Sequence, residues 1–305
     1  MSAASISEPD RGEILRERLV ELALSLPLGN QAALARLAVL CDDPTVTAQG
    51  AALEAARDES FTALLLKLAN SAHSMSVNRI SDLPAAIARL GFRLVQGLAI
   101  AAPGLRLLAG PNDGLGPARH ELHRHAVRVG LAARMLAPAT VDPERALTAG
   151  LLHNLGLNVI SLYSPTEFRL LLQAAERGEE IWPLEEELFG FSHAELGALL
   201  AERWSFPLTL VEAIRDHDSP NPANEFGWLV QVSDILVRSY GVGVEAPREL
   251  PNSLPEPAIG LERAQHQLRT LLEAQDRLDA RMDAEREPPP TGSPAAFAEA
   301  LDRLR

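Results

Sequence analysis

Apolar residues recur with helical spacing along almost the whole chain, at positions i, i+3, i+4 and i+7. Alternating apolar and polar residues, which would indicate strands, are almost absent. Proline and glycine divide the chain into segments of ordinary helix length, for example residues 59–73 and 142–164. The second of these opens with Asp142 as an N-cap, followed by Pro143. The pattern therefore predicts an all-α protein, a bundle of many helices.

The loop at residues 109–120, with the sequence AGPNDGLGPARH, is the best internal break in this pattern. It separates an N-terminal helical lobe, residues 13–110, from a second helical lobe, residues 115–240. We expect the two lobes to pack closely, because the helix after Gly91 is apolar on most sides. Residues 1–12 are expected to be a flexible N-terminus.

The composition changes after Tyr240. Residues 241–258 are rich in proline, glycine and acidic residues, which is typical of a linker or an irregular wrap. Residues 259–284 predict one long amphipathic helix, whose apolar stripe packs either on its own domain or on a partner such as a second copy of the chain. Residues 285–305 include the sequence EREPPPTGSP and are expected to be disordered.

The chain is acidic, with 305 residues, a formal net charge of -13 and a pI of about 5.1. This charge repels nucleic-acid phosphates and anionic membrane surfaces, so we expect neither as a partner. The sequence has no run of about 18 apolar residues, and its charged start does not fit a signal peptide. We therefore expect a soluble, cytoplasmic protein. Cys41 is the one cysteine, which excludes an internal disulfide and a cysteine-based zinc site.

Several polar residues share a helical face with apolar residues and are therefore expected to point inward. An ionisable group buried alone is costly, so such side chains must meet one another, water or a metal. Five of these positions lie on five successive predicted helices: His125, His153, His193, His217 and Asp234. They predict a common polar pocket, of the kind in which facing helices hold a metal. Each histidine could instead be a core residue bonded to a backbone carbonyl.

Three other histidines fit simpler roles. His120 and His123 lie three residues apart and could chelate a metal, but a solvated helix start explains them as well. His73 ends the segment KLANSAH and is expected at a surface between the lobes.

The order of the inward residues resembles the helical HD superfamily, whose phosphohydrolases bind divalent metal through a His, a His-Asp pair and a later Asp. The HD-related output domain, or HDOD, family is more similar still, over roughly residues 15–240. Five segments carry this resemblance: residues 66–74 (LKLANSAHS), 80–100 (ISDLPAAIARLGFRLVQGLAI), 124–136 (RHAVRVGLAARML), 149–156 (AGLLHNLG) and 187–217 (ELFGFSHAELGALLAERWSFPLTLVEAIRDH). The resemblance implies a bacterial signalling protein with an HD-like helical bundle. Receiver, cyclase or kinase modules, which often accompany such domains, would be partners on another chain.

Asn154 stands where the catalytic members of the superfamily have the Asp of the His-Asp pair. The resemblance implies that a metal, if one is held, would be bound by His125, His153 and Asp234. An amide is a neutral ligand, and one missing charge near two metal ions costs about 4 kcal/mol at an effective dielectric of ~20 and a distance of ~4 Å. A two-metal phosphodiesterase is therefore not expected. Leu157 also stands near the place where catalytic relatives often have a phosphate-binding lysine.

Three functions are compatible with these residues. The first is a non-catalytic regulatory module, without a cofactor, that binds a protein partner or senses a ligand in a remnant pocket. That pocket would comprise His125, His153, Asn154, His193, His217 and Asp234. The second is a mononuclear metal-dependent phosphohydrolase that tolerates asparagine in the pair. The third is a scaffold that acts through the helix at 259–284. Asp216 and Asp218 flank His217 and are either its partners or parts of a helix end.

Overall fold

The computed structural model describes most of the chain: residues 8–25, 30–71, 80–106, 113–218 and 224–246, with positions 266, 269, 270 and 273. Regular structure in these residues is entirely helical, as the apolar spacing predicts. Contacts divide the chain into two units, residues 1–259 and residues 260–305. The first unit contains helices α1 to α14.

The second unit contains most of the predicted amphipathic helix at 259–284 and the predicted tail at 285–305. Almost all of these residues lie outside the described part of the chain. The four described positions, His266, Arg269, Thr270 and Glu273, are helical and exposed. His73, which was predicted at a surface between the lobes, also lies outside the described residues.

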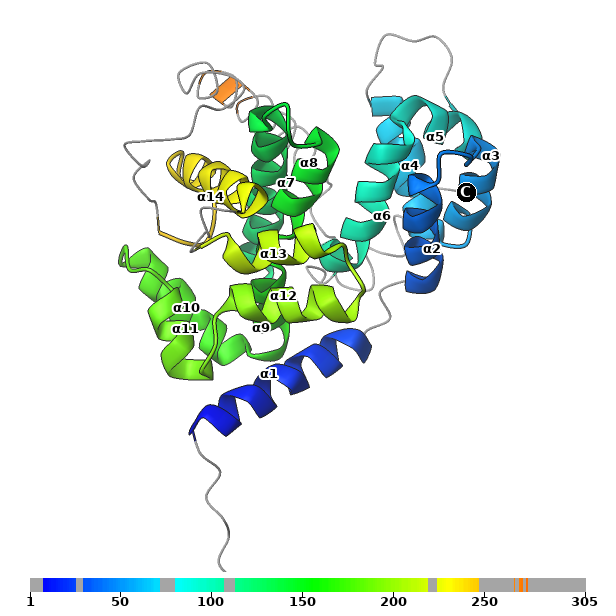
Figure 1. The fold of residues 1–305 in the computed structure, drawn as a ribbon. Coiled ribbons are helices and arrows are strands. Elements are labelled where there is room, and N and C mark those ends of the chain that lie inside the picture. Colours follow the sequence, from blue (N-terminus) through cyan, green and yellow to red (C-terminus); the bar gives the residue numbers. More distant parts are fainter. Residues whose placement is uncertain are drawn as a thin grey trace, which may run out of the picture. The chain divides into compact units, whose positions relative to one another are not determined.

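The N-terminal lobe is a compact set of helices around an apolar core (Figure 1). Its helices are α2 (Gln31–Asp42), α3 (Ala48–Ala55), α4 (Glu59–Ser71), α5 (Leu83–Leu90) and α6 (Phe92–Arg106). Side chains from all five form the core, including Leu34, Leu37, Phe61, Leu65, Ile87 and Val95. Cys41 belongs to the same core, and burial raises the pKa of its thiol to about 11. The single cysteine is therefore a small apolar core residue.

The second lobe positions the candidate site. Its helices are α7 (Gly116–Leu136), α8 (Pro143–Leu152), α9 (Leu155–Tyr163), α10 (Pro165–Glu176), α11 (Trp182–Phe189), α12 (His193–Arg203), α13 (Leu208–Asp216) and α14 (Glu225–Arg238). Helix α7 packs against α8 and α14, and α12 packs against α9 and α13. The helices that carry the inward polar residues are therefore neighbours in space. They are not successive in the sequence, as was predicted, because α10 and α11 lie between α9 and α12.

The segment at residues 142–164 is two helices instead of the one that its apolar spacing predicts. Asp142 caps α8 by accepting hydrogen bonds from the backbone of the first turn, as expected. The helix then ends at Leu152, and α9 begins at Leu155 after a turn formed by His153 and Asn154. The change of direction brings α9 against α12, and it places the His-Asn pair at the turn.

The two lobes pack closely through α6 and α8, as predicted. Glycines on α6 make this possible. A β-carbon on Gly97 would lie 2.3 Å from the Thr148 hydroxyl oxygen, and one on Gly104 would lie 2.6 Å from a Leu152 methyl group. A larger residue at either position would therefore require the Thr148 or Leu152 side chain to move.

Helix α1 (Glu8–Ser25) begins inside the segment that was expected to be flexible. It also lies in a different place from the prediction, which assigned residues from 13 onward to the N-terminal lobe. Its contacts are with α9, α11 and α12 of the second lobe (Figure 1). Leu19 and Val20 are buried there, and the Tyr163 hydroxyl donates to the Leu22 carbonyl at 2.9 Å. The start of the chain thus completes the second lobe.

Among the described helices, no single one is long and apolar enough to cross a membrane. The bent pair Leu83–Leu90 and Phe92–Gly104, with 104° between its two parts, passes the same test of length and composition when taken together.

Candidate functional site

The structure brings the six predicted pocket residues together in the second lobe. His125 lies on α7, Asp234 lies on α14, and His193 is the first residue of α12. His153 and Asn154 form the turn between α8 and α9, and His217 directly follows α13. All six are between 0 and 3% exposed. The rings form a row, with centroid separations of 5.2 Å for His125–His153, 5.1 Å for His153–His217 and 5.2 Å for His217–His193.

Each ring of this row points its Nδ1 atom outward, toward a hydrogen-bond acceptor. The acceptors are the Val242 carbonyl for His125 (3.1 Å), the Gly150 carbonyl for His153 (2.7 Å), the Ile214 carbonyl for His217 (2.7 Å) and the Glu185 carboxylate for His193 (2.9 Å). A carbonyl oxygen can only accept, so Nδ1 carries the proton in the first three rings. The Nε2 atoms therefore face inward, as they do in histidines that bind a metal and donate their other N–H to a carbonyl or carboxylate.

The first triad consists of His125, His153 and Asp234. The Asp234 Oδ1 atom lies 2.9 Å from His125 Nε2 and 3.9 Å from His153 Nε2. Burial alone would raise the pKa of Asp234, but the His125 ring and the Arg238 guanidinium hold it well below its usual range. Burial, with the neighbouring His217 and His125, lowers the pKa of His153 well below its usual range. The ionised Asp234 carboxylate thus lies against His125 Nε2, and this contact needs either a proton on Nε2 or a cation between the two atoms.

Four buried atoms of this region have no hydrogen-bond partner within the described residues: His125 Nε2, His153 Nε2, Asp234 Oδ1 and Asn154 Oδ1. Native proteins rarely leave such atoms unsatisfied. Two imidazoles and a carboxylate, with an amide oxygen beside them, suit a divalent ion such as zinc, iron or nickel. The residues present therefore fit one divalent cation, held by His125, His153 and Asp234.

The second triad consists of His193, His217 and Asp218. Its inward nitrogens, His193 Nε2 and His217 Nε2, lie 3.2 Å apart, and Asp218 Oδ2 is 3.4 Å from the first and 3.6 Å from the second. Burial acts to lower the pKa of His193, but Glu185, Asp218 and Glu245 together raise it to about 10. A second proton on His193 satisfies this triad, since its Nε2–H can donate to His217. The two triads therefore differ, because a proton completes the second, whereas a proton on His125 in the first would still leave His153 Nε2 and Asn154 Oδ1 without a partner.

Sequence reasoning missed three charged residues of the site. Glu185 on α11 is fully buried and accepts hydrogen bonds from both the backbone and the ring of His193. It belongs to a run of three glutamates, and the sequence does not show which of the three points inward. Arg238, on the same face of α14 as Asp234, donates to Asp234 Oδ2 at 3.3 Å and to Glu245 Oε2 at 3.1 Å. Its spacing of four from Asp234 was the available signal. Glu245 lies in the predicted linker, where composition carries no such signal.

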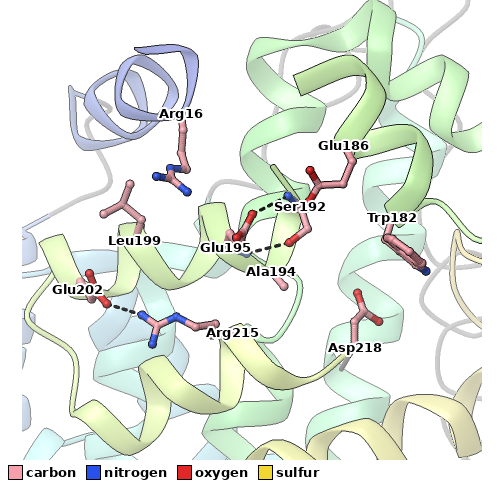
Figure 2. A pocket seen from close by; sticks show the side chains of 10 residues that line it. All are labelled: Arg16, Trp182, Glu186, Ser192, Ala194, Glu195, Leu199, Glu202, Arg215 and Asp218. Carbon is pink, nitrogen blue, oxygen red and sulfur yellow. Dashed lines mark hydrogen bonds and ion pairs between the residues drawn. The ribbon is translucent and has the colours of Figure 1, made fainter. Parts of the chain in front are cut away.

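A groove of about 640 Å³ lies next to the second triad (Figure 2). It is lined by Trp182 and Glu186 of α11, by Ser192 and residues of α12, by Arg215 of α13, and by Arg16 and Asp218. Burial, with the nearby Glu195 and Glu185, raises the pKa of Glu186. Asp218 is 15% exposed to this groove, whereas the histidines behind it are nearly fully buried. Solvent thus reaches the edge of the second triad through a mainly acidic groove.

The remaining candidates lie apart from the two triads. Asp216 is the last residue of α13 and accepts from the Asn224 side chain at 2.8 Å, so of the two acids around His217 only Asp218 contacts the rings. His120 is exposed and His123 half-buried on α7, and neither belongs to a possible metal group within the described residues.

The structural neighbours of this chain include helical proteins of related kinds. A candidate phosphohydrolase from Shewanella amazonensis shares 26% identity at a TM-score of 0.60, over 73% of this chain and 81% of its own. An HDOD domain protein of unknown function from Geobacter sulfurreducens shares 24% identity at a TM-score of 0.64, over 89% and 97%. A candidate signal transduction protein from Marinobacter aquaeolei shares 21% identity at a TM-score of 0.72, over 92% and 66%. At less than 25% identity, the last two similarities show that these proteins and this chain share a fold.

Two sequence comparisons bear on the family of this chain. An uncharacterized protein of Treponema pallidum (strain Nichols) is 35% identical over 181 residues, which are 57% of this chain. The match spans about a third of that relative, 34% of its length. The sequence model of the HDOD domain matches residues 27–220, which is more than half of this chain. The chain therefore belongs to the HDOD family.

Proposed function

We propose that this chain is a regulatory module of signal transduction that does not turn over a substrate. It would act by binding a protein partner, with the histidine pocket as a ligand-sensing or structural element. The observation that carries the proposal is the burial of the pocket. Each of the six side chains is at most 3% exposed, whereas a catalytic metal site keeps an open position for water or substrate.

Two further features support a module without turnover. Asn154 supplies no negative charge beside the first triad, and Leu157, near the place where catalytic relatives often have a lysine, is fully buried and cannot bind an anion. The groove beside the second triad is also unsuited to a phosphate. Its lining includes the acids Glu186, Glu195 and Asp218, the Glu202 carboxylate pairs with Arg215, and Arg16 is the other basic residue of the lining (Figure 2). A phosphate would meet mostly negative charge there.

A mononuclear phosphohydrolase is the second candidate function. The observation in its favour is the set of unpaired inward atoms in the first triad, which fits a divalent cation. The similarity to a candidate phosphohydrolase at 26% identity points the same way. A cation held by His125, His153 and Asp234 would supply Lewis acidity and an activated water. The chain's own residues would hold it, but they leave a substrate no exposed approach to it.

A hydrolysis assay decides between the two functions. Purified chain without a histidine tag is loaded in turn with Mn²⁺, Fe²⁺, Zn²⁺, Ni²⁺ and Mg²⁺, and its metal content is measured by mass spectrometry. Bis(p-nitrophenyl) phosphate and cyclic dinucleotides then serve as substrates. We expect rates equal to those of the His153→Ala variant with every ion. Hydrolysis that chelation and His153→Ala both abolish would overturn the regulatory proposal in favour of the enzyme.

A further inference from the structure

The residues 241–246, here called the pocket strap, lie directly against the candidate site. The Val242 carbonyl accepts from His125 Nδ1 at 3.1 Å, and the Gly243 backbone donates to Glu121 at 3.1 Å. Glu245 accepts from the Asn154 side chain at 3.4 Å. The strap thus contacts α7 and the α8–α9 turn at once. It lies beyond residues 27–220, the part that matches the family.

The strap is fitted to the pocket at Gly243. This residue has a φ of +128°, a backbone conformation that side chains rarely adopt. A β-carbon there would also lie 2.9 Å from His125 Nδ1. Only glycine lets the strap approach the ring this closely, so the position of Glu245 depends on Gly243.

The charges around Asp234 explain what Glu245 does. Arg238 is 1% exposed and donates to Asp234 Oδ2 at 3.3 Å, so its positive charge opposes any cation held by the other oxygen of Asp234. The same Arg238 Nη1 atom donates to Glu245 Oε2 at 3.1 Å, and the Glu245 side chain is only 5% exposed. The Arg238 side chain also donates to the Ala246 carbonyl. Glu245, together with the more exposed Glu180 at 4.0 Å, therefore offsets the charge of Arg238, and the other oxygen of Glu245 contacts Asn154.

We propose that Glu245 supplies, from the pocket strap, the negative charge that the His153-Asn154 pair lacks, and so enables the first triad to hold a divalent cation. Without Glu245, the triad would offer one carboxylate that Arg238 already neutralises. With it, the region of Asp234, Arg238 and Glu245 has a net charge of about -1, calculated from the usual ionisation of these groups. The inference rests on the ligand-sensing part of the proposed function, because cation binding and strap docking then reinforce each other.

Calorimetric titration of the chelator-treated full chain with Zn²⁺ tests this role. Glu245→Gln should weaken binding by about 10- to 100-fold, the usual effect of removing a group that supports metal ligands. The matched control Glu176→Gln changes an exposed glutamate on α10 and should leave the affinity unchanged. In the Glu245→Gln background, Asn154→Asp should restore the affinity, because it returns a carboxylate to the same region. Circular dichroism and thermal unfolding establish that each variant is folded.

A second variant tests the strap without touching any charge. Gly243→Ala should displace the strap from His125 and weaken Zn²⁺ binding to the same degree as Glu245→Gln. Hydrogen exchange should show that Zn²⁺ protects the amides of the strap in the natural chain and in Glu176→Gln, but not in Glu245→Gln. Equal Zn²⁺ affinity in Glu245→Gln and the natural chain would overturn the inference, as would a natural chain that binds no Zn²⁺.

The outcomes keep the two proposals apart. Metal-dependent hydrolysis that His153→Ala abolishes would overturn the regulatory function and leave the role of Glu245 standing. An unchanged affinity in Glu245→Gln, without hydrolysis in any variant, would overturn the role of Glu245 and leave the regulatory function standing.

Discussion

For three of the four inward histidines, the two explanations that the sequence left open hold at the same time. His125, His153 and His217 do bond to backbone carbonyls, through Nδ1. That bond fixes the tautomer, and the opposite nitrogen then faces the shared pocket. A residue pattern shows that a side chain points inward, but it does not show which ring atom meets which partner.

Asp113 and Arg119 form an ion pair in the second lobe between a partly exposed carboxylate and a buried guanidinium. The two Asp113 oxygens lie 2.8 and 2.7 Å from the Arg119 guanidinium, and Arg119 also donates to the Ser161 carbonyl at 2.6 Å. Hydrogen bonds from Arg119, against a smaller opposing effect of burial, hold the pKa of Asp113 well below its usual range. The pair therefore links the start of α7 to the end of α9.

Asp113→Asn should lower stability in a way that depends on pH. A carboxylate whose pKa is lower in the folded state stabilises the fold above its ordinary pKa, near 4, and that contribution disappears as the pH falls through the folded value. The difference in unfolding free energy between the natural chain and Asp113→Asn should thus be largest at neutral pH and shrink below pH ~4. Urea unfolding at several pH values measures it, with Glu176→Gln as control. A difference that is constant with pH would show that the ion pair contributes nothing.

At the scale of elements, glycine contacts determine how closely the site helices approach. Gly156 of α9 lies against α12, where an added β-carbon would be 2.0 Å from the His193 carbonyl oxygen. The partner is Gly197, whose β-carbon would meet the Gly156 nitrogen at 2.8 Å. Gly130 and Gly150 join α7 to α8 in the same way. These crossings bring His153 and His193 within one row.

Gly156→Ala should destabilise the chain strongly, because the nearest atoms belong to backbone that cannot move aside alone. Overpacking of this kind costs about 1–3 kcal/mol or more. The matched control is Gly50→Ala in α3, where an added β-carbon meets the Thr47 hydroxyl at an ordinary 3.4 Å and should be neutral or slightly stabilising. Urea unfolding compares the two. Equal stabilities for both variants would show that the α9–α12 crossing adjusts freely.

The sequence did not reveal the break between α8 and α9. Apolar spacing continues through His153 and Asn154, so periodicity alone predicts one helix over 142–164. After the break, α9 packs against α12, which is distant in sequence. Helix periodicity cannot register such a contact, because it reports only the direction of each side chain.

At the scale of the whole molecule, α1 is the element whose place was least predictable. Its apolar face could cover either lobe, and the structure places it on α9, α11 and α12. Arg203 of α12 pairs with Glu17 at 2.6 Å beside the buried Leu19 and Val20. The match to the family begins at residue 27, so α1 lies outside the matched region although it packs against helices within it.

A chain that begins at residue 27 should be less stable by about 3–6 kcal/mol, because two large apolar side chains each contribute ~1.5–3 kcal/mol on burial. Val20→Ala tests the same contact in the full chain and should cost about 1.5–2 kcal/mol, as two methyl groups leave a buried site. Val39→Ala on α2 is the control, since Val39 is 74% exposed and should have little effect. Thermal and urea unfolding measure these changes. No loss of stability in either the shortened chain or Val20→Ala would contradict the role of α1.

The sequence by itself determined the helical class and the inward direction of His125, His153, His193, His217 and Asp234. These follow from local periodicity and from the turn preferences of proline and glycine. Only the tertiary structure decided which of these groups meet, and which charges balance them. Glu245 lies 91 residues from its partner Asn154, and Glu185 reaches His193 from a separate helix. How deeply a side chain is buried, and which charges lie beside it, depend on contacts between residues that are distant in sequence. A local sequence pattern does not contain this information.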